Sequence, residues 1–294
     1  MTTALRLKLL ALTLATVTLI GLPVVPIVSS FAWAQDASTW DDQPHTAVRL
    51  IAGTTTKTPD TPMVRAGVEI KLDPGWHTYW RDPGDTGVPP TFDFSGSDNV
   101  KSATVLWPAP EQFPDGAGGN SIGYVDHVIL PLQVAPKDVT KSSSLHLKLG
   151  YAICGDLCVP VEANLQLALN GDGAEDAAIE KAEIRVPRRV PLGPNTGPDK
   201  GLAVLAVHRV PGGAHDRVIV DVAAPAGAPV DLFVEGPTPD WALPQPAASG
   251  GNGTTRQFAF DLDGLPPDAK PAGAMLTFTA VSGDDAIEVP AHLD

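Results

Sequence analysis

The sequence predicts an all-β protein made of β-sandwiches. Its 294 residues include 28 glycines and 30 prolines, and both residue types punctuate a chain with turns and weaken helices. Short segments of alternating apolar and polar residues recur with turn residues between them, which is typical of a sandwich. The length exceeds that of one ordinary sandwich and suits two domains of roughly 100–150 residues each.

The N-terminus predicts export. Two basic residues precede a nearly continuous apolar run from Leu9 to Val28, and Ala32-Trp33-Ala34 offers small residues at the two positions that a signal peptidase recognises. We expect residues 1–34 to be a signal peptide that is cleaved before Gln35, which would place the mature protein in a bacterial periplasm. An uncleaved membrane anchor is the alternative, because the run is just long enough to span a bilayer. No later segment approaches 18 apolar residues, so we expect no stable membrane insertion after cleavage.

A first domain is expected over residues 35–186. The pattern predicts its strands at Thr46–Ala52, Val64–Leu72, Trp76–Trp80, Ala103–Trp107, Val128–Val134, Leu145–Tyr151 and Ala163–Leu169. Good helix formers between Glu175 and Ile184 predict one helix, which Pro187 would end.

Residues 187–200 are rich in proline and glycine and are expected to be a linker. A second, smaller sandwich-like domain is expected over residues 201–294. Its predicted strands are Leu202–Val210, Val218–Ala223, Val230–Val234, Phe258–Leu262, Met275–Val281 and Ala286–Val289, with a flexible loop at Gly250–Thr254.

The charge excludes two classes of partner. The formal net charge is −14, and loss of the two basic residues of the signal peptide would make it about −16. Nucleic acids and anionic membrane surfaces both require a basic face, so we expect neither as a partner.

The two cysteines of the chain, Cys154 and Cys158, are the strongest candidates for chemistry. In an exported protein a disulfide between them is the default state. A purely structural bond is one interpretation, but so short a ring contributes only ~2 kcal/mol. Copper(I) is a second, because soft thiolates suit it; zinc would require four ligands.

Redox exchange is the third interpretation and the one we favour. A short ring can be strained, and strained or exposed disulfides are the more easily reduced ones. Gly155 permits a sharp turn, and Asp156 disfavours a thiolate beside it. Such a disulfide is suited to attack by a partner's thiolate. His77 and His127 could assist proton transfer, although lone histidines on strands are usually surface residues.

Four motifs together resemble the periplasmic N-terminal domain of the DsbD family of transmembrane disulfide reductases, and most closely its branch associated with suppression of copper sensitivity (ScsB-like). They are Pro74-Gly-Trp-His-Thr-Tyr-Trp-Arg81, Leu106-Trp-Pro108, Gly123-Tyr-Val-Asp126 and Tyr151-Ala-Ile-Cys-Gly-Asp-Leu-Cys-Val-Pro-Val-Glu162. The resemblance covers roughly residues 45–170 and implies an immunoglobulin-like sandwich.

The resemblance also implies a mechanism and partners. Cys154 and Cys158 would receive electrons from a membrane thiol transporter or a thioredoxin-like donor and pass them to periplasmic thiol proteins, with the first cysteine usually forming the mixed disulfide. Phe113 and Tyr124 are the candidates for an aromatic cap, and Tyr79 is expected to flank the pair. No cofactor and no metal are expected. The rival hypothesis is a non-catalytic binding or copper-handling module, and whether the exchange reaction makes the chain an enzyme stays open.

Overall fold

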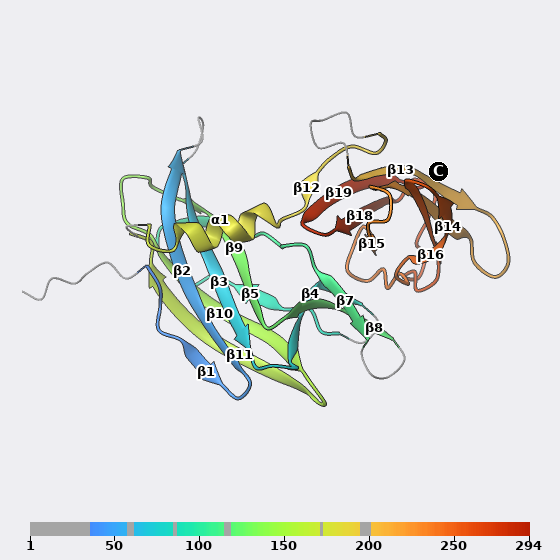
Figure 1. Ribbon diagram of the computed structural model, residues 1–294. Helices are drawn as coiled ribbons and strands as arrows, with labels where there is room; N and C mark the ends of the chain where they lie inside the picture. Colours follow the sequence, from blue (N-terminus) through green and yellow to red (C-terminus); the bar gives the residue numbers. More distant parts are fainter. Residues whose placement is uncertain (1–35, 58–61, 85–86, 115–118, 171–172, 195–200) are drawn as a thin grey trace, which may run out of the picture. The chain divides into compact units, whose positions relative to one another are not determined.

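Strands dominate the computed structural model, as the turn-rich sequence predicted (Figure 1). The structure describes residues 36–294 except 58–61, 85–86, 115–118, 171–172 and 195–200. The expected signal peptide and Gln35 therefore lie outside the described residues. The predicted fold class, an all-β and immunoglobulin-like chain, is confirmed.

Two facing sheets form the first sandwich. One has the order β1 (Asp41–Gln43), β2 (Thr46–Lys57), β3 (Pro62–Leu72), β9 (His127–Pro136), β6 (Val100–Val105). The other has the order β11 (Cys158–Ala168), β10 (Ser144–Cys154), β4 (His77–Gly84), β8 (Asn120–Val125), β7 (Glu111–Pro114), and β5 (Thr91–Asp93) pairs with β10.

Apolar side chains at every second position of the strands fill the space between these sheets. Leu50 and Val68 point inward from the first sheet, Leu147 and Leu149 from the second, and Trp80 is fully buried among them. Alternate residues of a strand face opposite sides, so each strand supplies one apolar row to the core. The other side of the second sheet is then free to carry a site.

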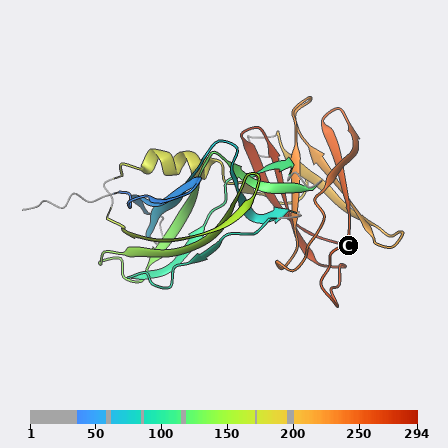
Figure 2. The same ribbon diagram turned by 90° about the horizontal axis from the view of Figure 1, so that it is seen from below.

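Helix α1 (Asp176–Ile184) covers the outer side of the first sheet, where Figure 2 shows it on the far side from the second sheet. It differs from the predicted helix by one residue at its start. Ile179 and Ala182 pack on Ile51 and Ile129 in a small separate core. The helix is thus a third layer, on the side of the sandwich that is remote from the cysteines.

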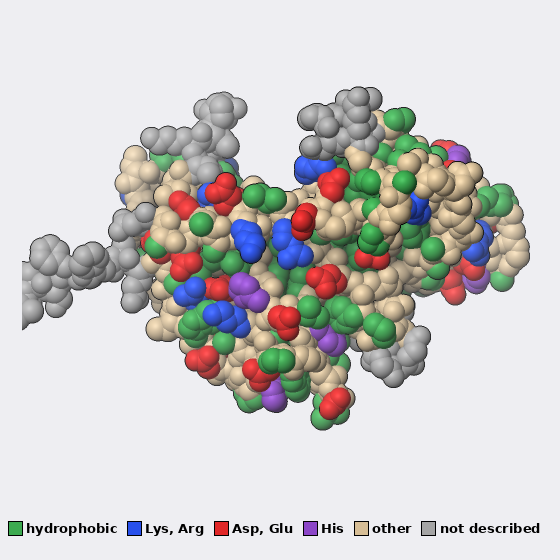
Figure 3. Space-filling view, viewed as in Figure 1, with side chains coloured by type: hydrophobic (Ala, Val, Ile, Leu, Met, Phe, Trp, Pro, Cys, Tyr) green, Lys and Arg blue, Asp and Glu red, His purple; other side chains and the backbone are tan. Residues whose placement is uncertain are grey.

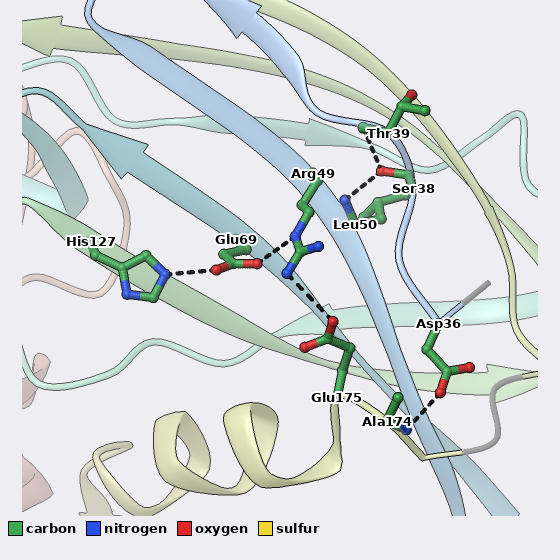
Figure 4. A network of polar contacts seen from close by, with 9 residues as sticks. All are labelled: Asp36, Ser38, Thr39, Arg49, Leu50, Glu69, His127, Ala174 and Glu175. Atoms are coloured by element: carbon green, nitrogen blue, oxygen red, sulfur yellow. Dashed lines mark hydrogen bonds and ion pairs between the residues drawn. The ribbon is translucent and has the colours of Figure 1, made fainter.

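Polar contacts tie the start of the helix to the sheet (Figure 4). Arg49 on β2 bonds Glu69 on β3 at 2.6 Å and Glu175 at 3.4 Å, and His127 on β9 lies 2.9 Å from the second oxygen of Glu69. The Asp36 carboxylate accepts a hydrogen bond from the Ala174 amide at 2.6 Å. His127 is therefore held in a structural network and lies away from the cysteines.

A second pair of sheets follows the helix. One has the order β12 (Arg188–Arg189), β19 (Asp285–His292), β18 (Met275–Ser282), β15 (Asp231–Glu235), and the other β13 (Ala203–Val210), β14 (Arg217–Ala223), β17 (Thr255–Asp261), β16 (Ala247–Asn252). They enclose their own core, which includes Phe258, Phe260 and Phe278.

Two segments differ from the sequence-based expectation. Arg188 and Arg189, expected in a linker, form β12, because their backbone pairs in parallel with Ile287 and Glu288. The expected loop at Gly250 lies largely in β16, where Gly251 has a φ of 110° that favours glycine.

The described residues form one compact unit, in which both sandwiches take part. Arg81 at the end of β4 pairs with Glu235 and Glu288, and Trp80 contacts Phe233 with ring centroids 5.8 Å apart. Figure 3 shows acidic and basic side chains interspersed on the visible face. Within the described chain, none of the helical segments has the length and hydrophobicity that crossing a bilayer requires.

Candidate redox site

The cysteine pair closes the β10–β11 hairpin. The two strands pair residue for residue from Ser144 opposite Ala168 to Cys154 opposite Cys158, and a disulfide joins the last pair. Residues directly opposite in an antiparallel pair have Cβ atoms only ~5 Å apart. The hairpin register therefore brings the two sulfurs together without any long-range contact.

The two cysteines differ sharply in exposure. Cys154 is 2% exposed and packs with Tyr79 and Ala152, whereas Cys158 is exposed at the start of β11. Beside it, Leu157 is 75% exposed and Val159 is also exposed. Of the two cysteines, Cys158 is therefore the one exposed to a protein-sized reagent, and exposed apolar residues flank it in the sequence.

Tyr79, which was expected to flank the pair, has its hydroxyl close to both sulfurs. Its hydroxyl lies 2.8 Å from Cys154 Sγ and 3.5 Å from Cys158 Sγ, and the side chain is buried. A hydroxyl donates a stronger hydrogen bond to an ionised sulfur than to a neutral one. Tyr79 can thus stabilise a thiolate on Cys154 far from bulk water.

The other predicted residues are distributed over both faces of the sheet. Phe113 on β7 is half-buried and packs on His77 beside the site, with ring centroids 4.5 Å apart. Asp156 is exposed in the hairpin turn. The structure does not bring Tyr124 to the sulfurs: its ring lies in the core between the sheets, and its hydroxyl donates to the Pro108 carbonyl at 2.8 Å.

Register explains the place of Tyr124. It lies opposite Thr78 on β4, and Thr78 and Tyr79 point to opposite faces because they are consecutive. Residues 115–118, which lie between the two cap candidates Phe113 and Tyr124 in the sequence, are outside the described residues. Within the described part, Phe113 is the aromatic residue of that stretch that reaches the site face.

Gly155 serves the hairpin in a way that the sequence did not indicate. The backbone of Gly155 does not have a positive φ, so the turn conformation alone does not require glycine. A Cβ atom there would lie 3.1 Å from the Trp76 ring. The Trp76 ring also stacks with the His45 ring, with centroids 4.2 Å apart and an interplanar angle of 8°. The glycine therefore allows the turn to pack directly on Trp76.

His77 is a second feature that sequence reasoning placed differently. The sequence left two interpretations, assistance in proton transfer or an ordinary surface histidine, and the structure places it directly opposite Cys154 on the neighbouring strand. Burial lowers its pKa from the usual value. Among the described residues, no cluster of three or more His, Cys, Asp or Glu side chains is arranged to hold a metal ion.

Comparison with known proteins relates the first sandwich to a protein family. Residues 47–170, which include most of the first sandwich, match the family model "Thiol:disulfide interchange protein DsbD, N-terminal". A search of curated proteins gives no match.

A solved structure resembles this chain in fold over more than residues 47–170. The crystal structure of the N-terminal periplasmic domain of ScsB from Proteus mirabilis matches with a TM-score of 0.67 and 22% sequence identity. The match covers 88% of this chain and 99% of that one, so the likeness in fold includes most of both sandwiches. Thiol–disulfide interchange is supported at the level of the family.

Proposed function

We propose that the chain is a periplasmic thiol–disulfide exchange protein whose reactive group is the Cys154–Cys158 disulfide. The observation that carries this proposal is the asymmetry of the pair. Cys158 is exposed between the exposed residues Leu157 and Val159, and Cys154 is buried with its sulfur against the Tyr79 hydroxyl. A reactive disulfide requires an accessible sulfur to attack and a stabilised sulfur to leave.

The exchange begins when a thiolate of a reducing partner attacks Cys158 Sγ. A sulfur–sulfur bond forms between the partner and Cys158 while the Cys154–Cys158 bond breaks, and its electron pair leaves on Cys154 as a thiolate. The Tyr79 hydroxyl, 2.8 Å away, donates a hydrogen bond to that thiolate. A second thiol of the partner then attacks the mixed disulfide, which releases Cys158 and leaves the partner oxidised.

This order places the mixed disulfide on Cys158. The resemblance had implied the first cysteine of the pair, Cys154. The reason is steric, because Cys154 is 2% exposed and lies under Tyr79. The reduced pair would pass its electrons on by the reverse steps, with Cys158 as the attacking thiolate.

The partners we propose are a membrane thiol transporter or a thioredoxin-like donor on one side and periplasmic thiol proteins on the other. Export by a signal peptide over residues 1–34, cleaved before Gln35, belongs to the same proposal. So does the division into a redox domain at 35–186, a second domain at 201–294, and a connecting segment at 187–200 from which β12 joins a sheet of the second sandwich. The two core clusters support this division, although the first also includes Phe233 of the second sandwich.

The equilibrium reduction potential tests the proposal. Thiol trapping of the oxidised and reduced chain in glutathione buffers should give a value of roughly −120 to −270 mV, the range of exchange proteins. A value below about −300 mV is typical of structural disulfides and would reject redox exchange.

A pair of single-cysteine variants tests the assignment of the two sulfurs. Cys154→Ser leaves the exposed thiol and should form a mixed disulfide quickly with oxidised glutathione, whereas Cys158→Ser leaves the buried thiol and should react much more slowly. Equal rates would show that exposure does not decide which sulfur is attacked.

A further inference from the structure

His77 stands in the row of side chains that contains the reactive sulfur. In the antiparallel pairing it lies directly opposite Cys154 on β10, and on its other side it lies opposite Val125 on β8. Residues paired in this way point to the same face of a sheet, with Cβ atoms ~5 Å apart. His77 is also two residues from Tyr79 on β4, so the imidazole shares the face of the Tyr79 hydroxyl and Cys154.

Aromatic rings enclose the imidazole on this face. Phe113 lies 4.5 Å from it, centroid to centroid, and Tyr79 lies 5.5 Å away and meets it edge-on at 89°. The Nε2 atom is buried and has no hydrogen-bond partner in the described structure. A buried polar atom without a partner is costly, and a redox or catalytic role is one of the explanations for retaining it.

The surroundings contain few charges that could act on this imidazole. From β4 and β10 the titratable neighbours are Tyr79 and Cys154, β11 contributes Cys158, and the turn between them contributes the exposed Asp156. On the other side β8 presents Val125 and β7 presents Phe113, which carry no charge, and β7 also presents the exposed Glu111 two residues before Phe113. Of the described carboxylates, none forms an ion pair with His77.

The sulfur opposite His77 is therefore the group whose charge changes when the proposed exchange reaction runs. In the disulfide it is neutral, and burial keeps the imidazole neutral as well, with its pKa lowered. After reduction Cys154 Sγ carries a negative charge, and an opposite charge within ~4–6 Å favours the protonated imidazole. The two groups then titrate as a coupled pair.

We propose that His77 binds a proton when the Cys154–Cys158 disulfide is reduced and releases it when the disulfide forms again. This inference rests on the proposed function, which it deepens. A reducing dithiol supplies two electrons and two protons. Both electrons enter the broken sulfur–sulfur bond, one proton goes to Cys158, and the second resides on His77 beside the Cys154 thiolate. His77 is thus a positioning residue that holds the proton of the reduced state.

The direct test is the titration of the histidines by NMR in the oxidised and the chemically reduced full chain. The pKa of His77 should rise by about one unit or more on reduction. The other six histidines serve as internal controls, and in particular His45, which stacks on Trp76 and pairs with Asp73. If the pKa of His77 is the same in both redox states, the inference is wrong.

Variants supply a second readout. In the Cys158→Ser background, thiolate absorbance reports the ionisation of Cys154, and replacing His77 with either Phe or Gln should move its midpoint upward by about one pH unit. His45→Phe in the same background should leave the midpoint unchanged. A midpoint that does not move in folded His77→Gln protein would overturn the inference.

These outcomes are separable from failure of the proposed function. Both measurements use chemically reduced protein, so they remain valid if the potential lies below −300 mV and exchange is rejected. Conversely, a potential in the exchange range with an unmoved His77 would reject the proton-binding role alone.

Discussion

Tyr79 and Tyr151 are two buried tyrosines that differ in the contact their hydroxyls make. The hydroxyl of Tyr79 lies 2.8 Å from Cys154 Sγ, whereas that of Tyr151 lies 3.1 Å from the Thr46 hydroxyl on the other face of the sheet. A disulfide sulfur is a weak acceptor and a thiolate is a strong one. The Tyr79 hydroxyl should therefore stabilise the reduced protein more than the oxidised one.

Tyr79→Phe should accordingly make the disulfide harder to reduce. A hydrogen bond to a charged group contributes about 1.5–3 kcal/mol, and ~1.4 kcal/mol corresponds to ~30 mV for a two-electron couple. We expect a potential that is roughly 30–60 mV more negative in glutathione buffers. Tyr151→Phe removes the same atom on the opposite face and should leave the potential unchanged. An equal shift in both variants would mean that the effect is a general loss of packing.

Protonation of His77 should also make stability depend on pH. Its pKa in the oxidised folded state is lowered, so the unfolded chain binds the proton more tightly. Above ~6.5, the pKa of histidine in the unfolded chain, His77 has no effect on the free energy of unfolding. As the pH falls from there toward the lowered pKa of the folded state, the free energy of unfolding decreases. Oxidised His77→Phe should thus lose less stability than wild type between pH 7 and pH 5 in urea unfolding. A parallel loss in the two proteins would contradict this.

At the scale of residues, the sequence predicted which side chains react but not which side chains surround them. The expected export together with two cysteines predicted the disulfide, and Tyr79 was expected to flank it. The sequence could not decide which sulfur is buried, because that depends on Tyr79 and Ala152 from two strands. Nor could it place His77 opposite Cys154, since cross-strand register is a property of the folded sheet.

At the scale of elements, alternation and turn residues predicted most strands of both sandwiches. Short edge strands such as β1, β5 and β7 were missed because three or four residues carry no clear period. Tyr124 illustrates the limit of motif reasoning: it lies in a recognised motif, yet register turns it into the core. The strand that contains Tyr124, β8, was not predicted from the sequence, and the face that Tyr124 occupies depends on the pairing of β8 with β4.

Helix α1 offers an element-scale test with a matched control. Ile179 is fully buried against the sheet, whereas Ile184 on the same helix is 73% exposed. Ile179→Ala removes packed methyl groups and should lower the free energy of unfolding by about 2–4 kcal/mol, whereas Ile184→Ala should cost no more than ~0.5 kcal/mol. Neither should change the reduction potential, because the helix lies on the sheet that does not carry the cysteines.

Urea unfolding and thiol trapping of the same two variants check both statements. A changed potential in Ile179→Ala, with the fold retained, would mean that the helix communicates with the disulfide through the core. Equal destabilisation by the two substitutions would contradict the burial of the helix face.

At the scale of the whole molecule, β4 connects the redox site with the second sandwich. Two residues after Tyr79, Arg81 bonds both oxygens of Glu235 at 2.8 and 2.7 Å and one oxygen of Glu288 at 2.7 Å. The Arg81 side chain is 26% exposed and those of the two glutamates are 20% exposed. Paired geometry of this kind makes arginine hard to replace.

Arg81→Gln should destabilise the chain, since it leaves two neighbouring carboxylates partly buried without a cation. Breaking a fully buried pair costs about 3–5 kcal/mol, and partial exposure should reduce this to roughly 2–3 kcal/mol. Arg188→Gln is the control, because Arg188 bonds Asp285 at 2.6 Å but is 44% exposed; an exposed pair is worth at most about 1 kcal/mol. Urea unfolding of the oxidised chain measures both losses. If Arg188→Gln costs as much as Arg81→Gln, the charge contacts of β4 have no special part in joining the sandwiches, and the hydrophobic contact of Trp80 with Phe233 would have to hold them together.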